Sequence, residues 1–238
     1  MALGTTLTAA TVVSTTSGTH NIALAAEGVT ALQSTFGGGG KLTVCLMSYY
    51  HDYLGNEPAE GGAYTRISCT YSESAGASRD PQLKFVWSGG STDDVYSEGT
   101  GNDDDGKLGR FNLDGTATWA DMVGDIDSSS LSRNVTSGVQ STGVYSRRFA
   151  GRGAVIRDCS RSYFVFDLSG VSIPTGETVA SGSLHFYLDN LGTSTGDSAK
   201  IIAVQATAMA GDATDFGNCF VADAVAVAHN APFFGSNF

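Results

Sequence analysis

One stretch of the sequence, residues 161–188, most restricts the fold that this chain can adopt. It opens with a run of β-branched and aromatic residues, Tyr163 to Phe166, and then has the proline and glycine of a tight turn at Ile173 to Gly176. Its last part, Ser183 to Leu188, alternates polar and apolar residues with the period of two that marks a strand with one buried face. The stretch therefore predicts two strands joined by a corner.

The composition extends this prediction to the whole chain. The 238 residues are 41% hydrophobic, which is enough for a full core, and 31 glycines with only 4 prolines suit many short strands joined by tight turns. We expect an all-β chain in the form of an antiparallel, jelly-roll-like β-sandwich. Helix is expected only in short pieces near Ala26 to Ser34 and Trp119 to Val123.

Further strands are predicted from alternating or β-branched runs along the chain. They cover His20 to Leu24, Lys41 to Met47, Tyr64 to Tyr71, Pro81 to Trp87, Lys107 to Leu113, Lys200 to Ala208 and Phe220 to Val227. Apolar residues occupy both faces of the Lys41 to Met47 strand, so we expect it to be covered on both sides. The polar, serine-rich interval 128–142 is expected to be a loop.

An abrupt change of composition marks a boundary in the middle of the chain. Residues 89–106 are rich in Asp and Gly and poor in apolar side chains, which predicts an acidic linker. We therefore expect one half of a sandwich at residues 1–88 and another half at residues 107–238.

The formal net charge of −11 argues against binding along a nucleic-acid backbone, which needs clustered Lys and Arg. No stretch reaches the roughly 20 apolar residues of a membrane-spanning helix. Catalytic and cofactor signatures are missing as well, because the four histidines are scattered and no nucleophile elbow or phosphate-binding loop is present. We expect a protein that is not an enzyme and has no cofactor.

Charge is unevenly distributed along the chain. Acidic residues crowd the interval from Asp93 to Asp127, whereas arginines crowd the next one, at Arg147, Arg148, Arg152, Arg157 and Arg161. Two interpretations stay open: the two segments neutralise each other within one molecule, or they steer contacts between copies.

Two local patterns are candidate ligand sites, each with an ordinary alternative. Asp103 and Asp105 lie in an acidic run that could ligate calcium, although the spacing is not that of an EF-hand and a solvated loop is the alternative. A run of aromatic and polar residues could form a sugar-binding platform, or could simply be core and rim packing; it consists of Tyr49, Tyr50, His51, Asp52 and Tyr53.

Two further patterns concern covalent chemistry outside the cell. Asn134 begins an N-glycosylation sequon in a segment expected to be exposed. The four cysteines have no metal-type spacing. If the protein lives outside the cell, we expect one disulfide within each half, Cys45 with Cys69 and Cys159 with Cys219. Four buried, reduced thiols are the alternative.

A family resemblance adds to this picture. One set of residues in this chain resembles the core of DNRLRE-type β-sandwich domains. The set consists of Arg161, Tyr163-Phe164, Phe166-Asp167-Leu168-Ser169, Ile173-Pro174, Gly176 and the run Val179 to Tyr187. These domains are similar to carbohydrate-binding modules and occur in secreted bacterial proteins and phage virion proteins. Gly182 stands where the family usually has alanine. The resemblance implies a β-sandwich and a role outside the cell or on a particle surface.

The resemblance also implies an unusual order of the two halves. Residues 20–87, which end in the run Asp80 to Trp87, resemble the closing half of the family, yet they precede the opening half in this chain. The halves can close on each other within one copy, or residues 107–238 of one copy can pair with residues 1–87 of the next. The second arrangement is head-to-tail strand complementation, which gives an open filament.

Two apolar segments favour the filament. The carboxy-terminal Phe233, Phe234 and Phe238 are costly to leave in water, and the uncharged first 26 residues, with Leu7, Val12 and Val13, resemble an inserted strand. We therefore expect a self-assembling filament outside the cell or on a virion surface, with other copies of the chain as its partners. A monomeric module that binds glycans is the alternative.

Overall fold

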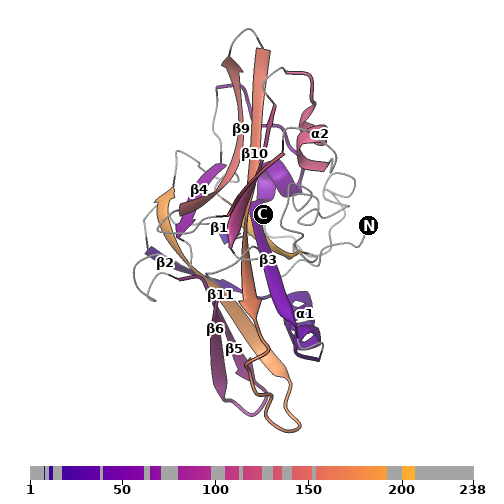
Figure 1. Ribbon diagram of the computed structural model, residues 1–238, viewed down its shortest axis with the longest axis vertical. Coiled ribbons are helices and arrows are strands. Elements are labelled where there is room, and N and C mark those ends of the chain that lie inside the picture. Colours follow the sequence, from indigo (N-terminus) through magenta and orange to yellow (C-terminus); the bar gives the residue numbers. More distant parts are fainter. Residues whose placement is uncertain are drawn as a thin grey trace.

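The computed structural model describes residues 8, 11–12, 18–37, 40–61, 65–70, 80–97, 105–112, 115–124, 131–135, 141–151, 154–191 and 200–206 (Figure 1). Strands dominate this part of the chain, and the helical segments are short. The helical segments are α1 (Ala26–Gly37), the π-helical turn η1 (Tyr49–Tyr53) and α2 (Trp119–Gly124). The strands are β1 (Thr11–Val12), β2 (Gly18–Ala23), β3 (Lys41–Ser48), β4 (Thr65–Thr70), β5 (Gln82–Trp87), β6 (Thr92–Tyr96), β7 (Gly106–Asn112), β8 (Leu131–Val135), β9 (Ser141–Gly151), β10 (Ala154–Asp167), β11 (Val179–Leu191) and β12 (Lys200–Gln205).

The strands form two antiparallel sheets that pack together, as the sequence predicts. The first sheet has the order β1-β12-β3-β10-β7-β8, and the second has the order β6-β5-β11-β2. Strands β9 and β4 pair with each other and link the sheets edge to edge, since β9 also pairs with β10 and β4 with β11. All described pairings are antiparallel, so the coarse prediction of a β-sandwich is confirmed.

Strand β10 organises the first sheet and runs along the long axis of the molecule (Figure 1). Its amino-terminal part lies between β9 and β7, and its carboxy-terminal part pairs with β3. One strand can serve three neighbours because it is 14 residues long, more than twice the length of an average strand of about 5 to 6 residues.

The main core lies between the two sheets and is closed on one side by α1. Phe164 of β10 meets Phe186 of β11 with 5.0 Å between ring centroids. From α1, Phe36 packs against Phe85 and Trp87 of β5, each at 5.3 Å between centroids. The helix ends at Gly37, where the predicted glycine run begins. The expected helix near Ala26 to Ser34 is thus confirmed, and its apolar face completes the sandwich.

A second core covers the opposite face of the first sheet. Met47, Tyr163 and Ile202 lie on this face and pack with Trp119 and Met122 of α2. Every residue of β3 except Lys41 is buried. This confirms both the short helix predicted near Trp119 and the prediction that β3 is covered on both sides.

Strands from the two halves of the chain alternate within both sheets. In the first sheet, β3 from residues 1–88 lies between β12 and β10 from residues 107–238. In the second sheet, β11 lies between β2 and β5, so that Leu184 is opposite Ile22 on one side and Leu83 on the other. The main core is therefore built jointly from both halves.

The acidic interval 89–106 differs from its prediction as a linker. It contains β6, which pairs with β5 along its whole length. Four of its five residues are exposed because β6 is an edge strand with only Val95 turned toward the core, so its sequence lacks the apolar residues of a central strand. Trp87 Nε1 donates a hydrogen bond of 2.7 Å to Asp93, which ties β6 to β5.

The structure bears differently on two other expectations. The interval 128–142, expected to be a loop, contains β8 and the start of β9. Both strands pair with neighbours far away in sequence, which the polar composition did not indicate. The strand expected at Phe220 to Val227 lies outside the described residues. Within the described part of the chain, no helix is long and apolar enough to span a bilayer.

Candidate functional site

The predicted sugar-binding platform at residues 49–53 is folded into the interior. These residues form η1, which follows β3 directly, and Tyr49, His51, Asp52 and Tyr53 are all buried. Tyr49 and Tyr53 stack on each other within the second core, with 5.9 Å between centroids. The structure corrects the prediction of an exposed aromatic platform, because only Tyr50 is partly accessible. Core packing, the alternative, describes this run of residues.

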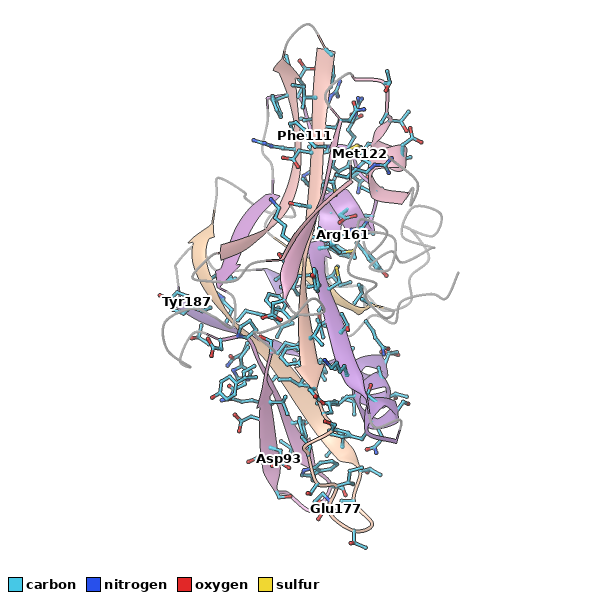
Figure 2. The ribbon with its side chains drawn as sticks, in the orientation of Figure 1. Asp93, Phe111, Met122, Arg161, Glu177 and Tyr187 are labelled. Atoms are coloured by element: carbon cyan, nitrogen blue, oxygen red, sulfur yellow. The ribbon has the colours of Figure 1, made fainter. Side chains whose placement is uncertain are left out.

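A buried ion pair joins η1 to β10. Arg161 Nε donates to Asp52 Oδ2 at 2.8 Å, and Nη2 donates to Oδ1 at 2.7 Å, while both side chains are 1% exposed. The same Nη2 also donates to the carbonyl of Val123, 2.7 Å away. Figure 2 labels Arg161, whose side chain extends from β10 in the middle of the molecule. Burial alone lowers the pKa of Arg161, but the charge and hydrogen bonds of Asp52 outweigh it and raise the pKa above its ordinary value. The Arg161 guanidinium stays charged, and its contacts with Asp52 and Val123 hold η1, β10 and α2 together.

His51 extends this polar cluster toward α2. Its backbone carbonyl accepts a hydrogen bond of 2.8 Å from Trp119 Nε1, and its Nδ1 lies 2.8 Å from the Asn56 carbonyl. Burial lowers the pKa of His51, although the Asn56 carbonyl and the charge of Asp52 act in the opposite direction. A neutral ring that donates through Nδ1 fits this site, whose role is structural.

The structure describes two of the four cysteine side chains. Cys45 and Cys159 are both buried thiols, and the Cys45–Cys69 and Cys159–Cys219 bridges expected outside the cell stay predictions. The side chain of Cys69 and the whole of Cys219 lie outside the described residues. Burial, followed by the charge of Asp52, raises the pKa of Cys159 well above its ordinary value. A protonated thiol of this kind is a poor nucleophile, so Cys159 acts as a core side chain.

Among the described residues, the arginine-rich segment forms its ion pairs with acidic residues outside the interval Asp93 to Asp127. Arg147 pairs with Asp158 at 2.9 Å, and Arg157 pairs with Glu57 at 2.7 Å. Arg148 lies 3.5 Å from Glu57. The loop after η1 supplies Glu57, and Asp158 belongs to β10 itself. The acidic residues of β6 therefore remain on the surface rather than against these arginines.

The structure describes two of the three residues in the predicted calcium and glycosylation sites, Asp105 and Asn134. Asp105 is buried and accepts from Ser97 Oγ at 2.7 Å and from the backbone N–H of Val165 at 3.2 Å, which is a structural tether. Its candidate calcium partner Asp103 lies outside the described residues, and no group of three or more metal-ligating side chains occurs in the part that the structure describes. Asn134 lies in β8, opposite Lys107, and not in a loop.

The residues expected to form an assembly interface fall mostly outside the described part of the chain. Five of them are not described by the structure: Leu7, Val13, Phe233, Phe234 and Phe238. Of Val12 only the backbone is described, and it pairs in β1 with Lys200 of β12. The one described neighbour in this segment, Thr8, is buried and accepts a hydrogen bond from the backbone N–H of Ala203 at 3.2 Å. The described positions of the amino-terminal segment, Thr8, Thr11 and Val12, thus lie beside β12 of the same chain.

The outward-facing side of the second sheet carries polar groups that the sequence did not single out. In β5 the core-facing residues include Leu83 and Phe85, and in β11 they include Leu184 and Phe186. Because side chains alternate along a strand, the residues between them face outward. Cross-strand register then places Ser183, Lys84 and Asp94 in one row. The next row holds His185, Gln82 and Tyr96. The only sequence signal was the polar side of the alternation in Ser183 to Leu188.

A hollow of about 440 Å³ lies over these rows, lined by residues of β5, β6 and β11 that include Lys84, Asp94, Ser183 and His185. Ser183 Oγ lies 2.9 Å from His185 Nε2, which resembles the first two members of a nucleophilic triad. Burial and then the charge of Lys84 lower the pKa of His185, and no carboxylate contributes to this shift. Among the described residues, no carboxylate accepts a hydrogen bond from the His185 ring.

These observations define a class of protein: a mostly-β chain with two antiparallel sheets packed as a β-sandwich, a buried ion pair in its interior and a polar hollow on one outer face. Comparison with protein-family models, with curated proteins and with solved structures finds no match. Function is therefore inferred from the residues and contacts of this chain itself.

Proposed function

We propose that the protein is a structural subunit that assembles, outside the cell or on a virion surface, into a head-to-tail filament. In this assembly residues 107–238 of one copy complete the sandwich of residues 1–88 of the next. The proposal rests on one observation, the alternation of strands from the two halves within both sheets.

The alternation makes each half dependent on the other. Residues 183–188 of β11 pair with β2 along one edge, and residues 179–185 of β11 pair with β5 along the other edge. Both edges of β11 are therefore paired with strands of the first half. Strand β3 is held in the same way between β12 and β10. A half separated from its complement would expose long unpaired edges and the apolar face of its strands, which strongly favours recapture of a complementary half.

Exchange between copies keeps all of these contacts. The halves are covalently joined only by the chain between Ser97 and Asp105, so an altered path there suffices to place the second half on a neighbouring copy. The buried Arg161–Asp52 pair also joins the two halves and is remade in the exchange. Because the contact is between different surfaces of two copies, it does not need to close and repetition extends it into a filament.

Cysteine pairs across the halves provide a direct test. Thr19 of β2 and Tyr187 of β11 are direct cross-strand neighbours, at a spacing that allows a disulfide. We would prepare the single variants Thr19→Cys and Tyr187→Cys, mix them in denaturant, refold them together at high concentration and oxidise them. Half exchange predicts disulfide-linked dimers of the two different variants, together with filaments in negative stain.

The matched control replaces one variant with Glu27→Cys, because Glu27 lies in α1 and not opposite Thr19. Mixed Thr19→Cys and Glu27→Cys chains should give no cross-link above the wild-type background. If only the double variant Thr19→Cys/Tyr187→Cys forms a bridge, within a monomer, the halves of one chain close on each other and the filament is excluded.

A further inference from the structure

Strand β6 leaves one edge of the second sheet open. It lies beside β5 at the lower end of the molecule (Figure 1), and within the described part of the chain β5 is its only strand partner. Just after β6, the N–H of Ser97 donates to the Pro81 carbonyl at 2.9 Å, so the odd-numbered residues on this side bond to β5. Because backbone groups alternate along an antiparallel strand, three residues point theirs away from β5: Thr92, Asp94 and Tyr96.

Strand β8 leaves an edge of the first sheet open in the same way. Among the described residues it pairs only with β7. The N–H of Val165 in β10 donates to Asp105 at 3.2 Å instead of bonding to β3, so the odd-numbered residues of β10 point toward β7. Through the registers of these strands, the alternation directs Lys107 and Gly109 of β7 toward β8. The residues of β8 whose backbone groups point away from β7 are therefore Leu131, Arg133 and Val135.

These two open edges carry opposite charge. Strand β6 holds Asp93 and Asp94 and no basic residue, and four of its five residues are exposed. Strand β8 holds Arg133 and no acidic residue, whereas the edge strands β1 and β2 hold no Asp, Glu, Lys or Arg. Carboxylates on an edge strand oppose pairing with a second acidic strand, so a strand with a positive residue opposite Asp94 is the partner that fits.

One antiparallel register between the two edges matches both the backbone and the side chains. When Asp94 of one copy is opposite Arg133 of another, the flanking pairs are Tyr96 with Leu131 and Thr92 with Val135. All three pairs join residues whose backbone groups point outward on both strands, so each pair can exchange two hydrogen bonds. A shift by one residue would set outward groups against inward ones and lose this match.

We propose that β6 of one copy of the chain pairs antiparallel with β8 of another copy, in a contact centred on Asp94 and Arg133. Asp94 keeps acceptor capacity for the guanidinium, because Gln82 Nε2 bonds to one of its two oxygens. The contact rests on the proposed function only in taking a second copy of the chain as the partner. It does not require exchange of the halves, since β6 and β8 stay at the sheet edges whichever copy supplies each half.

Cross-linking of natively folded chains tests this contact. Chains carrying Tyr96→Cys and chains carrying Leu131→Cys are mixed without denaturant and oxidised. Opposite residues of such a pair lie about 5.5 Å apart between Cα atoms, which a disulfide can span. We expect a disulfide-linked dimer of the two variants above the wild-type background. Tyr96→Cys mixed with Glu27→Cys is the control and should give none, because Glu27 lies in α1.

Charge reversal tests the central pair of the contact. Asp94→Arg added to the Tyr96→Cys chain should slow cross-linking about tenfold or more, because attraction to Arg133 becomes repulsion. Arg133→Asp added to the Leu131→Cys chain should then restore the rate. Glu27→Arg changes the net charge equally and should leave the rate unchanged. Thermal unfolding of each variant checks that it is folded.

Three results would overturn the contact. The first is no cross-link between the folded variants at high protein concentration, which would leave the acidic edge as a guard against pairing. The second is an unchanged rate with Asp94→Arg. The third is faster cross-linking of Tyr96→Cys to Thr19→Cys than to Leu131→Cys, which would make β2 the partner edge.

The edge contact and the exchange of halves can fail separately. Strands β6 and β8 do not pair with each other within the described sandwich, so a cross-link between native Tyr96→Cys and Leu131→Cys chains does not report exchange. The refolding test with Thr19→Cys and Tyr187→Cys reports exchange and not the edge contact.

Discussion

Arg161 on β10 holds both carboxylate oxygens of Asp52 on η1, at 2.8 and 2.7 Å, across 109 residues of sequence. The pair also fixes the end of α2 through the Val123 carbonyl. It is therefore the point where a strand of the second half, the turn after β3 and a covering helix are held together.

We predict that Asp52→Ala will destabilise the protein by about 3 to 5 kcal/mol, because it leaves the Arg161 charge buried without its partner. The measurement is the free energy of unfolding from a urea titration. The control is Glu57→Ala, which removes the partner of Arg157 in a more accessible pair and should cost about 1 kcal/mol or less. An equal loss of unfolding free energy in the two variants would show that the buried pair stabilises the fold no more than the accessible pair does.

Gly106, at the start of β7, should not tolerate a side chain. A Cβ at this position would collide with the hydroxyl and ring of Tyr163, which is fully buried and cannot move aside. We expect Gly106→Ala to cost about 1 to 3 kcal/mol of unfolding free energy. Gly170→Ala is the control, because no atom lies within 4 Å of its added Cβ, and it should change stability by about 0.5 kcal/mol or less. A neutral Gly106→Ala would contradict the packing of Tyr163 against β7.

The buried thiols make a prediction about reactivity. Cys45 and Cys159 should resist alkylation in the native protein and react after denaturation without reductant, since both are buried and the pKa of Cys159 is raised by burial. Mass spectrometry of the alkylated peptides reads out each position. Detection of either residue in a disulfide would restore the bridges expected from the sequence.

Acid should weaken the fold partly through His51. In the unfolded chain its pKa is close to 6.5, whereas burial lowers the pKa in the folded state. The folded protein therefore binds this proton less readily, and the stability that His51 contributes is present above about pH 6.5 and lost as the pH falls through the lower folded value. Urea titrations at several pH values between 7 and 5 should show a shallower loss of stability in His51→Gln than in the wild type. His20→Gln, in β2 of the second sheet, serves as the control, and an unchanged slope in His51→Gln would contradict the prediction.

Local pattern was enough to predict most of the elements. The alternation in Ser183 to Leu188 and the β-branched run of Tyr163 to Phe166 reappear as parts of β11 and β10, because side-chain period depends only on neighbours along the chain. The same holds for α1, which ends where the glycine run begins, and for the short helix at Trp119. These features, and the β-sandwich class that they imply, were available from the sequence by itself.

Only the tertiary structure decided where polar and aromatic side chains lie. The run from Tyr49 to Tyr53 has the composition of a surface platform, but Asp52 is buried because its partner Arg161 arrives from a strand 109 residues away. The acidic β6 is a strand because β5 offers an edge, and the row of Ser183, Lys84 and Asp94 exists only through the register of three strands. Pairing between distant segments is set by the whole fold, and no local pattern carries that information.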